Sequence, residues 1–470
     1  MKKLLTTLIV TLWLSCVLTN NCFAAIAAAT VWEVRTTGSS NNGGGYFSGG
    51  GTDYSQQDAA QLSLTDLANL SASTTLTSAT GGFTSAMVNN TIYIASGTNF
   101  IVNYYQITAY TDTNTVTIDR TANATLDASA GVGYVGGALI SLNTAVGTAA
   151  VSSNTIHVQS GTYAETVTFN SAKDDLVIIG YKTARLDSPS GTNRPYIDAT
   201  GLTNGLNIVT GSSGHYIVNM RIANATADGI NEVGNAYFIN VKSSNNGDKG
   251  CEIAGDTAHI ACEYNNNTGS GSGGEPYSGV TFYYSYGHDN AGFGLSMSKY
   301  NYECRVIGNL AEGNTSHGLY MAQTGFINSN TAYNNTGATT DGIRFGSGNG
   351  APNKGIVCNN NSSNNGRYGI VQGNDWLLFV FLNNAYYGNG TAGLYYLNSF
   401  ALSGGNVTTD TMTGVGGVVS SGSSVLNAGL DVSTLSGASV YDYKVNIGVD
   451  QDDNVAAGAG GGRGARFLIQ

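Results

Sequence analysis

The clearest pattern in this chain is a glycine followed by alternating apolar and polar residues, repeated at nearly constant intervals. The segments GLYMA from Gly318 and GIRFG from Gly342 show the alternation, which is typical of a strand. Five of the eight intervals between the repeat glycines are 24 residues long, which predicts a solenoid. The glycines are Gly205, Gly229, Gly250, Gly294, Gly318, Gly342, Gly369, Gly393 and Gly417, the last in a looser copy.

Each repeat also contains a second strand and an asparagine-rich turn. RVIGN from Arg305 and GIVCN from Gly355 are examples of the second strand. An asparagine stands four residues before several repeat glycines, and in stacked coils such amides would bond to those above and below. These asparagines are Asn246, Asn290, Asn314, Asn365 and Asn389. Two or three strands per coil of ~24 residues, stacked at about 4.8 Å, predict an all-β parallel β-helix.

Two intervals are longer than the period. The 44 residues from Gly250 to Gly294 are expected to form two unequal coils, with residues 265–278 projecting as a loop from one of them. The 27 residues from Gly342 to Gly369 carry three extra positions. Insertions in solenoids map to loops, often on a binding face.

The region upstream of the repeats resembles a known superfamily. NTIHVQSGTYAETVTF (154–169) and DLVIIGY (175–181) resemble early coils of the right-handed parallel β-helices of the pectate-lyase-like superfamily, which includes phage tailspikes. WEVRTTGSSNNGGG (32–45) is similar to the opening strand of that group, which normally leads into a capping helix. Residues 56–70 are the candidate for that helix, and a β-rich insertion follows at about 74–123. The resemblance implies the fold and selects no chemistry.

The pattern divides the chain into four parts. Residues 1–24 have the basic start, apolar run and small final residue of a secretory signal peptide, so we expect a secreted or cell-surface protein. Residues 25–136 are expected to form a β-rich capping region with a short helix, or alternatively a separate domain. Residues 137–428 form the β-helix, and residues 429–470 form a C-terminal cap with a glycine-rich tail. After the leader, no segment is apolar enough to span a membrane.

Composition restricts the partners. The formal net charge of −11, with only 19 Lys and Arg, argues against nucleic acid as a partner, because phosphate contacts need clustered positive charge. Cys251, Cys262, Cys304 and Cys358 follow the leader with no CxxC pair, so no zinc site is expected, and disulfides or buried thiols both remain open. Residues 450–454 (DQDDN) begin like a calcium loop but lack its final glutamate. No cofactor is therefore predicted, and calcium lacks support.

Candidate chemistry follows from the direction of the side chains. If the apolar residue after each glycine points inward, the residue before the glycine and the second residue after it point outward. One outward row then holds Asp228, Lys249, Phe293, His317, Asp341 and Tyr368, and the other holds Asn231, Glu252, Ser296, Tyr320, Arg344 and Tyr395. The densest mixture of titratable and aromatic groups, and thus the candidate catalytic set, is His317, Tyr320, Asp341 and Arg344. The candidate substrate-binding residues are Asp228, Lys249, Glu252, Tyr368 and Tyr395.

These rows support several interpretations. In a lyase of the resembled superfamily, Arg344 would neutralise a uronate carboxylate while His317 or Tyr320 moves a proton. A hydrolase needs two carboxylates, and Asp341 has no carboxylate partner on adjacent coils in these rows. The plainer alternative is an ordinary solvated wall, in which Asp–Arg neighbours contribute little and tyrosines stabilise the stack. His157, His215, His259 and His288 are read as isolated surface or packing histidines.

The leading hypothesis is a secreted β-helix protein that binds an extracellular or cell-surface polysaccharide along its flank, with cleavage left open. One alternative is a non-catalytic adhesin or a structural fibre of a cell surface or virion. Another is an active polysaccharide lyase or glycoside hydrolase. A homotrimer would favour the fibre or virion class.

Overall fold

The computed structural model describes residues 26–123, 125–274, 279–297, 304–322, 325–345, 353–373, 377–395 and 402–404. Contacts divide the chain into two compact units. The first contains residues 37–140 with the flanking segments up to residue 33 and at 149–154, and the second contains residues 34–36, 141–148 and the chain from residue 155 onward. Each unit is described by itself. Residues 1–24, the predicted leader, and the repeat copy at Gly417 lie outside the described residues.

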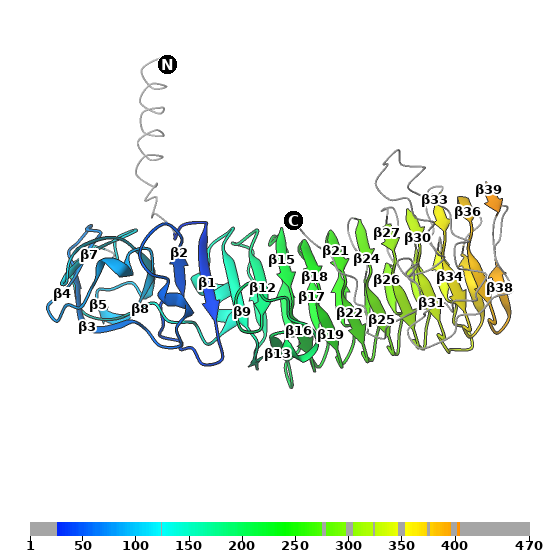
Figure 1. The fold of residues 1–470 in the computed structure, drawn as a ribbon, viewed down its shortest axis with the longest axis horizontal. Coiled ribbons are helices and arrows are strands. Elements are labelled where there is room, and N and C mark those ends of the chain that lie inside the picture. Colours follow the sequence, from blue (N-terminus) through cyan, green and yellow to red (C-terminus); the bar gives the residue numbers. More distant parts are fainter. Residues whose placement is uncertain are drawn as a thin grey trace, which may run out of the picture. The chain divides into compact units, whose positions relative to one another are not determined.

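The first unit is built on a closed six-stranded antiparallel barrel in the order β3-β4-β7-β6-β5-β8 (Figure 1). Its interior is filled by a cluster that includes Leu64, Leu67, Ile92 and Val116. The strands are β3 (Leu62–Asn69), β4 (Thr75–Ser78), β5 (Thr91–Thr98), β6 (Asn103–Asp112), β7 (Thr115–Ile118) and β8 (Ala128–Val135). The unit also contains an antiparallel pair, β1 (Thr30–Val34) with β2 (Gly45–Phe47), and the short turns η1 (Tyr54–Gln56) and η2 (Ser85–Met87).

The helix predicted at 56–70 is wrong. That segment contains only the last residue of η1 and then the barrel strand β3. Leu64, Leu67 and Asn69 are buried while the residues between them are more exposed, so tertiary packing selects a strand where the sequence also suited a helix.

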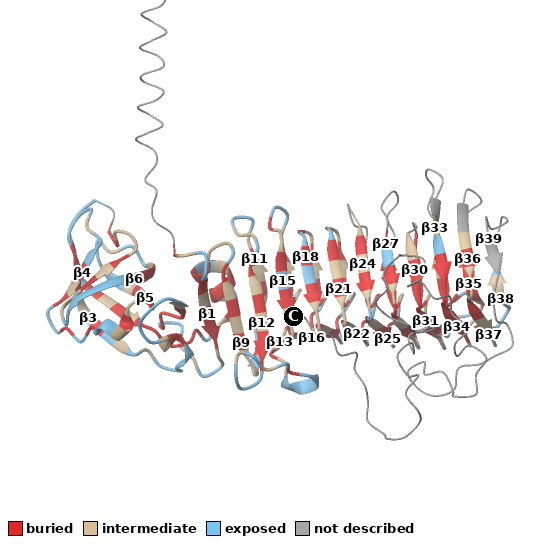
Figure 2. Ribbon diagram, turned by 45° about the horizontal axis from the view of Figure 1, so that its top comes forward, coloured by how far each residue is buried: buried red, intermediate tan, exposed pale blue. Residues whose placement is uncertain are grey.

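The second unit is a β-solenoid of parallel strands, with coils of ~24 residues over 155–395. Every coil contributes one strand to each of three sheets, and the side chains that face the lumen are buried (Figure 2). The predicted parallel β-helix is therefore confirmed.

The three sheets are named in the order in which the chain visits them. In this unit the first sheet contains β9 (Thr155–Gln159), β12 (Val177–Tyr181), β15 (His215–Val218), β18 (Ala236–Ile239), β21 (Thr257–Ile260), β24 (Val280–Tyr283), β27 (Cys304–Ile307), β30 (Phe326–Asn328), β33 (Asn353–Cys358), β36 (Leu377–Leu382) and β39 (Leu402–Gly404). The second sheet contains β10 (Thr162–Tyr163), β13 (Tyr196–Asp198), β16 (Arg221–Ala223), β19 (Lys242–Ser244), β22 (Glu263–Asn265), β25 (Tyr286–His288), β28 (Leu310–Glu312), β31 (Thr331–Tyr333), β34 (Asn361–Ser363) and β37 (Ala385–Tyr387). The third sheet contains β11 (Val167–Phe169), β14 (Leu206–Ile208), β17 (Ile230–Glu232), β20 (Cys251–Ile253), β23 (Ser272–Gly274), β26 (Leu295–Met297), β29 (Leu319–Met321), β32 (Ile343–Phe345), β35 (Tyr368–Gln372) and β38 (Ala392–Tyr395).

The repeat glycines stand in one line along the solenoid. A Cβ added to Gly318 would lie 2.7 Å from the carbonyl oxygen of Gly342, and one added to Gly369 would lie 2.5 Å from that of Gly393. This close approach of backbone to backbone is why the position takes glycine. Gly271 fills the place between Gly250 and Gly294, so the long interval does hold two coils.

The predicted projecting loop at 265–278 is wrong for its described part. Residues 263–274 form β22, a turn and β23, which are in register with the coils on both sides. Small polar residues and glycines fit the third sheet at β23 because the neighbouring coil leaves no room for larger side chains. A Cβ on Gly273 would lie 2.0 Å from the hydroxyl of Ser296 in the next coil. Residues 275–278 lie outside the described part.

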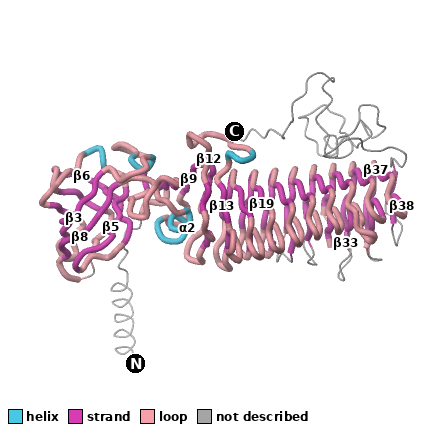
Figure 3. Tube along the Cα trace, turned by 90° about the horizontal axis from the view of Figure 1, so that it is seen from below, coloured by secondary structure: helices cyan, strands magenta, loops and turns pink. Residues whose placement is uncertain are grey.

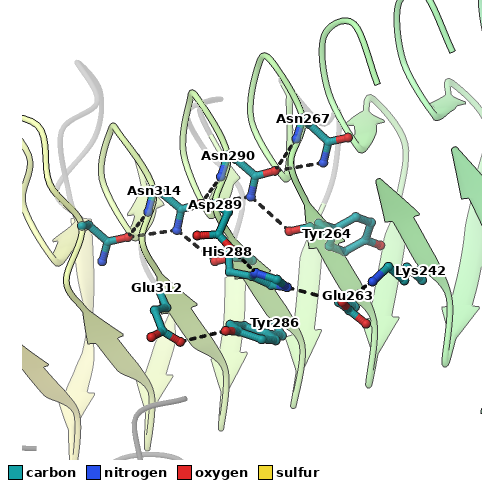
Figure 4. Close-up of polar contacts among 12 residues, drawn as sticks. Lys242, Glu263, Tyr264, Asn267, Tyr286, His288, Asp289, Asn290, Glu312 and Asn314 are labelled. Atoms are coloured by element: carbon teal, nitrogen blue, oxygen red, sulfur yellow. Dashed lines mark hydrogen bonds and ion pairs between the residues drawn. The ribbon is translucent and has the colours of Figure 1, made fainter. Parts of the chain in front are cut away.

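The predicted asparagine ladder is confirmed at the turn between the second and third sheets. Each side-chain amide donates to the side-chain oxygen of the next coil, as from Asn290 to Asn314 and from Asn314 to Asn335, both at 2.9 Å (Figure 4). The residue before each ladder asparagine has a left-handed backbone, for example Asp289 and Gly313. The ladder runs through Asn246, Asn267, Asn290, Asn314, Asn335, Asn365 and Asn389.

A second ladder, which the sequence pattern did not reveal, lies at the turn between the first and second sheets. Its amides are linked at 2.9 Å in each step. It consists of Asn309, Asn330, Asn360 and Asn384. Two turns of every coil in this region are thus fixed by the same device, which satisfies buried backbone groups without water.

A short helix covers the start of the solenoid. α2 (Leu142–Thr144) continues into the turn η3 (Ala145–Ala149) (Figure 3). Leu142, Ala145 and Val146 are fully buried. The carboxylate of Glu165 accepts the backbone N–H of Leu142 at 2.7 Å and the hydroxyl of Ser141 at 2.6 Å. A capping helix therefore exists, but it lies after the barrel strands in the sequence and not at residues 56–70, where it was predicted. A further turn, η4 (Gly191–Asn193), lies in the connection between β12 and β13.

All four cysteines after the predicted leader are buried, and Cys251, Cys262 and Cys358 are free thiols. Burial raises the pKa of Cys262 to about 11 and of Cys358 to about 12, so these two thiols stay protonated and unreactive. None of the helices in the described ranges is long and apolar enough to cross a membrane.

Candidate functional site

The outer face of the third sheet holds the residues that the sequence places in two outward rows. Ser296, Tyr320 and Arg344 are direct neighbours in the parallel register of β26, β29 and β32. Asn231 and Glu252 are paired in the same way farther toward the N-terminus. The row continues past Arg344 through Val371 to Tyr395.

Three aromatic planes stack at the centre of this face. The rings of Phe293 and Tyr320 are 4.9 Å apart and nearly parallel, and His317 stacks on Phe293 at 5.6 Å and on Tyr320 at 5.8 Å between ring centroids. Each of these side chains is half-buried. The arrangement offers a flat amphipathic surface that extends from one coil to the next.

Asp341 lies beside this stack and is enclosed by cations. Its side chain is 0% exposed, and Arg367 binds both carboxylate oxygens, with Nε 2.8 Å from Oδ1 and Nη2 2.6 Å from Oδ2. Nη1 of Arg344 lies 3.2 Å from Oδ2. The hydrogen bond to Asp341 raises the pKa of the Arg367 guanidinium. Both carboxylate oxygens are thus occupied by charge-assisted hydrogen bonds.

His317 is held in one neutral form. Its Nδ1 accepts the backbone N–H of Asp341 at 2.9 Å, so the ring proton is assigned to Nε2. Burial lowers the pKa of His317 to about 4, although Asp341 opposes that shift. At neutral pH the imidazole is therefore an uncharged plane, and its basic nitrogen is already engaged.

A second aromatic pair follows along the same face. The rings of Tyr368 and Tyr395 stack at 4.9 Å, and the guanidinium of Arg367 lies 5.0 Å from the centroid of Tyr368. The five residues Phe293, Tyr320, Arg367, Tyr368 and Tyr395, with His317, Asp341 and Arg344, are called the aromatic face below. Sequence reasoning missed Arg367 because it stands two residues before its glycine, outside both predicted rows.

The other candidate binding residues form a separate charged group on β20 and on the turns that precede β17 and β20. Lys249 forms ion pairs with Glu252 and, at 3.8 Å, with Asp248, and its backbone N–H donates to Asp228 at 3.0 Å. Burial raises the pKa values of Asp228 and Glu252. The structure thus brings Asp228, Lys249 and Glu252 together, apart from the aromatic face.

The second sheet carries a polar cluster that the sequence did not predict (Figure 4). Glu263 lies 2.6 Å from Nζ of Lys242 and 3.3 Å from Nε2 of His288, and the hydroxyl of Tyr286 donates to Glu312 at 2.8 Å. The rings of Tyr286 and His288 stack at 3.9 Å. The interpretation of His288 as isolated is therefore wrong.

The titration of that cluster follows from its pairing. Burial disfavours the ionised form of Glu263, but hydrogen bonds from His288 and Lys242 outweigh it and lower the pKa to about 2. Burial lowers the pKa of His288, and its two carboxylate partners raise it more, so the net shift is upward. Because Glu263 stays ionised, it is a structural anion and a poor proton donor. In the described ranges, no group of three His, Cys, Asp or Glu side chains is placed to hold a metal ion.

No protein-family model matches the sequence, and no curated protein matches it. Solved structures share the fold at low identity. The chain is similar to pectate lyase Pel9A, with 17% identity, a TM-score of 0.49, and 66% of this chain and 91% of that chain covered. It is also similar to the catalytic unit of a GH87 α-1,3-glucanase from Streptomyces thermodiastaticus strain HF3-3, with 14% identity, a TM-score of 0.37, and 77% of this chain and 88% of that chain covered. The tailspike protein gp49 of Pseudomonas phage LKA1 has 13% identity and a TM-score of 0.22, with 75% of this chain and 64% of that chain covered. The predicted resemblance to pectate-lyase-like β-helices holds for the fold, and the parallel strand order of the solenoid itself establishes that fold.

Proposed function

We propose that this protein is exported and binds a polysaccharide along the aromatic face. The observation that carries the proposal is a pair of partly exposed aromatic stacks on one face, Phe293 with His317 and Tyr320, and Tyr368 with Tyr395, on either side of the coil that carries Asp341 and Arg344. Sugar rings present apolar faces that pack on such planes, while their hydroxyls need polar partners at the edge. A polymer is the ligand that fits, because equivalent contacts recur along the axis of the solenoid.

Binding fits the geometry better than cleavage does. Asp341 is fully enclosed by two guanidiniums and has no free oxygen with which to accept a proton. His317 is neutral, and Nδ1 already accepts a hydrogen bond. Arg344 and Arg367 remain about a quarter exposed at their side chains, so their outer edges are available to ligand oxygens. Two cations around one buried anion leave a net positive charge, which favours a glycan with carboxylate or sulfate groups.

A glycan array tests this proposal with a matched pair of variants. Tyr320→Ala removes one plane of the aromatic face, and Tyr237→Ala removes one ring of an equally well stacked pair, Tyr216 and Tyr237 at 4.7 Å, on the first sheet. Stacking contributes about 0.5–1.5 kcal/mol, so Tyr320→Ala should weaken retention of the bound glycan by roughly threefold to tenfold. Tyr237→Ala should leave the affinity unchanged.

Three outcomes would contradict the proposal. The wild-type chain could retain no glycan, or the two variants could bind equally well. Release of new reducing ends or unsaturated sugars by the wild type, lost in Asp341→Ala, would replace binding with catalysis as the function of this surface.

A further inference from the structure

The outer face of the first sheet differs from the other two outer faces because it is apolar. One outward row carries six aliphatic or aromatic side chains on six successive coils, each the register partner of the next. They are Ile179, Val218, Ile239, Ile260, Tyr283 and Ile307, all half-buried. The other outward row contains Val177, Tyr216, Tyr237, Ala258, Thr281, Arg305 and Phe326.

These two rows, called the apolar face, leave large hydrophobic groups in contact with solvent. Tyr216 is 41% exposed and Tyr237 is 40% exposed. Arg305 is the single charged residue in the two rows between β12 and β30. The outward positions of the second sheet hold ionised groups in the same coils, such as Lys242 and Glu263. Parallel sheets are normally covered on both faces, and a long exposed apolar patch marks a docking surface.

We propose that residues 440–449 of this chain dock on the apolar face. The sequence there, VYDYKVNIGV, alternates strictly from Tyr441 onward. Tyr441, Tyr443, Val445, Ile447 and Val449 share one side of an extended strand, and Asp442, Lys444 and Asn446 share the other. Such a strand has one apolar side to bury and one polar side to present to water, which is the complement that the apolar face needs.

The connection to this segment has the required start and length. The last described strand, β39 (Leu402–Gly404), belongs to the first sheet, so the remaining chain starts from the sheet that carries the apolar face. Residues 405–439 then provide 35 residues, or roughly 115 Å when extended at about 3.3 Å each. If residues 405–428 form the further coil predicted around Gly417, residues 429–439 still provide roughly 36 Å. The strand β21, which carries Ile260, lies six strand spacings from β39 and seven from such a coil, or roughly 34 Å at about 4.8 Å each.

Photo-cross-linking in the full-length chain tests the docking directly. A benzophenone amino acid replaces Ile260 in the apolar face, and the same probe replaces Glu252 on the third sheet as the control. We expect mass spectrometry of the monomer band to identify a peptide from residues 440–449 attached at position 260 and absent at position 252. Cross-links between two chains would assign the face to a second copy, and attachment to any other segment or to none would overturn the proposal.

A pair of double variants with opposite phase supplies the second measurement. Val445→Asp with Ile447→Asp places charges on the apolar side, whereas Asp442→Ala with Lys444→Ala changes only the polar side. The first should abolish the cross-link at position 260 and increase the fluorescence of an apolar-surface dye several-fold, and the second should do neither. Equal behaviour of the two variants would show that the alternation has no role. Both readouts are independent of glycan binding, so they stand whether or not the aromatic face binds a polysaccharide.

Discussion

Two positions that recur in every coil of the solenoid differ in how strongly their residue type is conserved from coil to coil. At the turn between the second and third sheets, seven successive coils place asparagine at the same position. On the outer face of the third sheet, one register row holds Asn207 and Asn231 and then a different residue in each coil: Glu252, Gly273, Ser296, Tyr320, Arg344, Val371 and Tyr395. The fold therefore requires the first position and leaves the second open to other roles.

The physical reason is that an amide can bond to a copy of itself, because it both donates and accepts. A carboxylate or a guanidinium cannot, since like charges directly opposite each other repel. A repeated position can thus be asparagine or an apolar residue, whereas the ion pairs of Asp341 with Arg344 and Arg367 require different residues at neighbouring positions of the wall. Repetition indicates structure here, and departure from it marks the residues that are available for binding.

The largest effect is expected from Asn314→Leu, which interrupts the ladder. Asn314 accepts from the backbone and side chain of Asn290 and donates to Asn335 and to the carbonyl of Gly287. Each orphaned buried group costs about 1–3 kcal/mol, so the free energy of unfolding should fall by at least about 3 kcal/mol in a denaturant titration. Asn231→Leu, in the outward row, is the matched control and should change it by less than about 1 kcal/mol. Equal losses would remove the distinction between the two regions.

The second prediction concerns an inward position that breaks the repeat. Glu232 is fully buried in the lumen between Ile208 and Ile253, and its Oε1 has no hydrogen-bond partner. Burial raises its pKa from 4.5 to about 8. Between about pH 4.5 and pH 8 the unfolded chain has lost this proton and the folded chain retains it, so stability falls as pH rises through that window.

Glu232→Gln should remove this pH dependence and keep the shape of the side chain. Relative to the wild type, the free energy of unfolding of the variant should rise by about 3 kcal/mol between pH 5 and pH 8, measured as the difference in Tm at each pH. Glu165→Gln, at the capping helix, is the comparison for a carboxylate whose oxygens are hydrogen-bonded. A constant Tm difference between wild type and Glu232→Gln would mean that Glu232 is ionised in the folded chain.

The third prediction concerns Asp341 and the two arginines that bind it on the aromatic face, Arg344 and Arg367. Asp341→Ala leaves Arg344 and Arg367 without their shared anion, and the backbone contact with His317 remains. Because both arginines are partly exposed, water relieves part of the cost, and we expect a loss of about 1–2 kcal/mol in the free energy of unfolding. Arg305→Ala, a guanidinium on the first sheet, is the control and should have little effect. No loss in Asp341→Ala would indicate an ordinary surface ion pair.

The sequence predicts what repeats and misses what does not. The glycine line, the coil period and one ladder follow from spacing alone. The spacing does not predict Asn335 as a ladder residue because it stands seven residues, instead of four, before Gly342. It does not predict Asn267 because the glycine that follows, Gly271, precedes a serine and not an apolar residue. The barrel strand at 62–69 was mistaken for a helix because its partners, β4 and β8, are far away in sequence and nothing local specifies them.

The candidate site shows the same division. Register placed His317, Tyr320, Asp341 and Arg344 on one face, but Arg367 reaches Asp341 from a turn position that periodicity does not mark. The cluster around Glu263 and His288 lies on strands of three residues, without a glycine signal, and only the pairing of β22 with β25 brings it together.

The smallest effect is expected at the charged group near the start of the face. Lys249→Ala removes the ion pair with Glu252, but both side chains are more than a quarter exposed, so solvent screens the interaction. We expect a change below about 1 kcal/mol in the free energy of unfolding, and the change should shrink further in 0.5 M salt. Val218→Ala, in the apolar face, is the contrasting variant because its contribution is insensitive to screening. The contrary result would be that Lys249→Ala lowers the free energy of unfolding as much as Asp341→Ala does. In that case ion pairs anywhere on the outer wall would be needed for stability. The variation of the outward rows would then no longer indicate that the fold leaves those positions free.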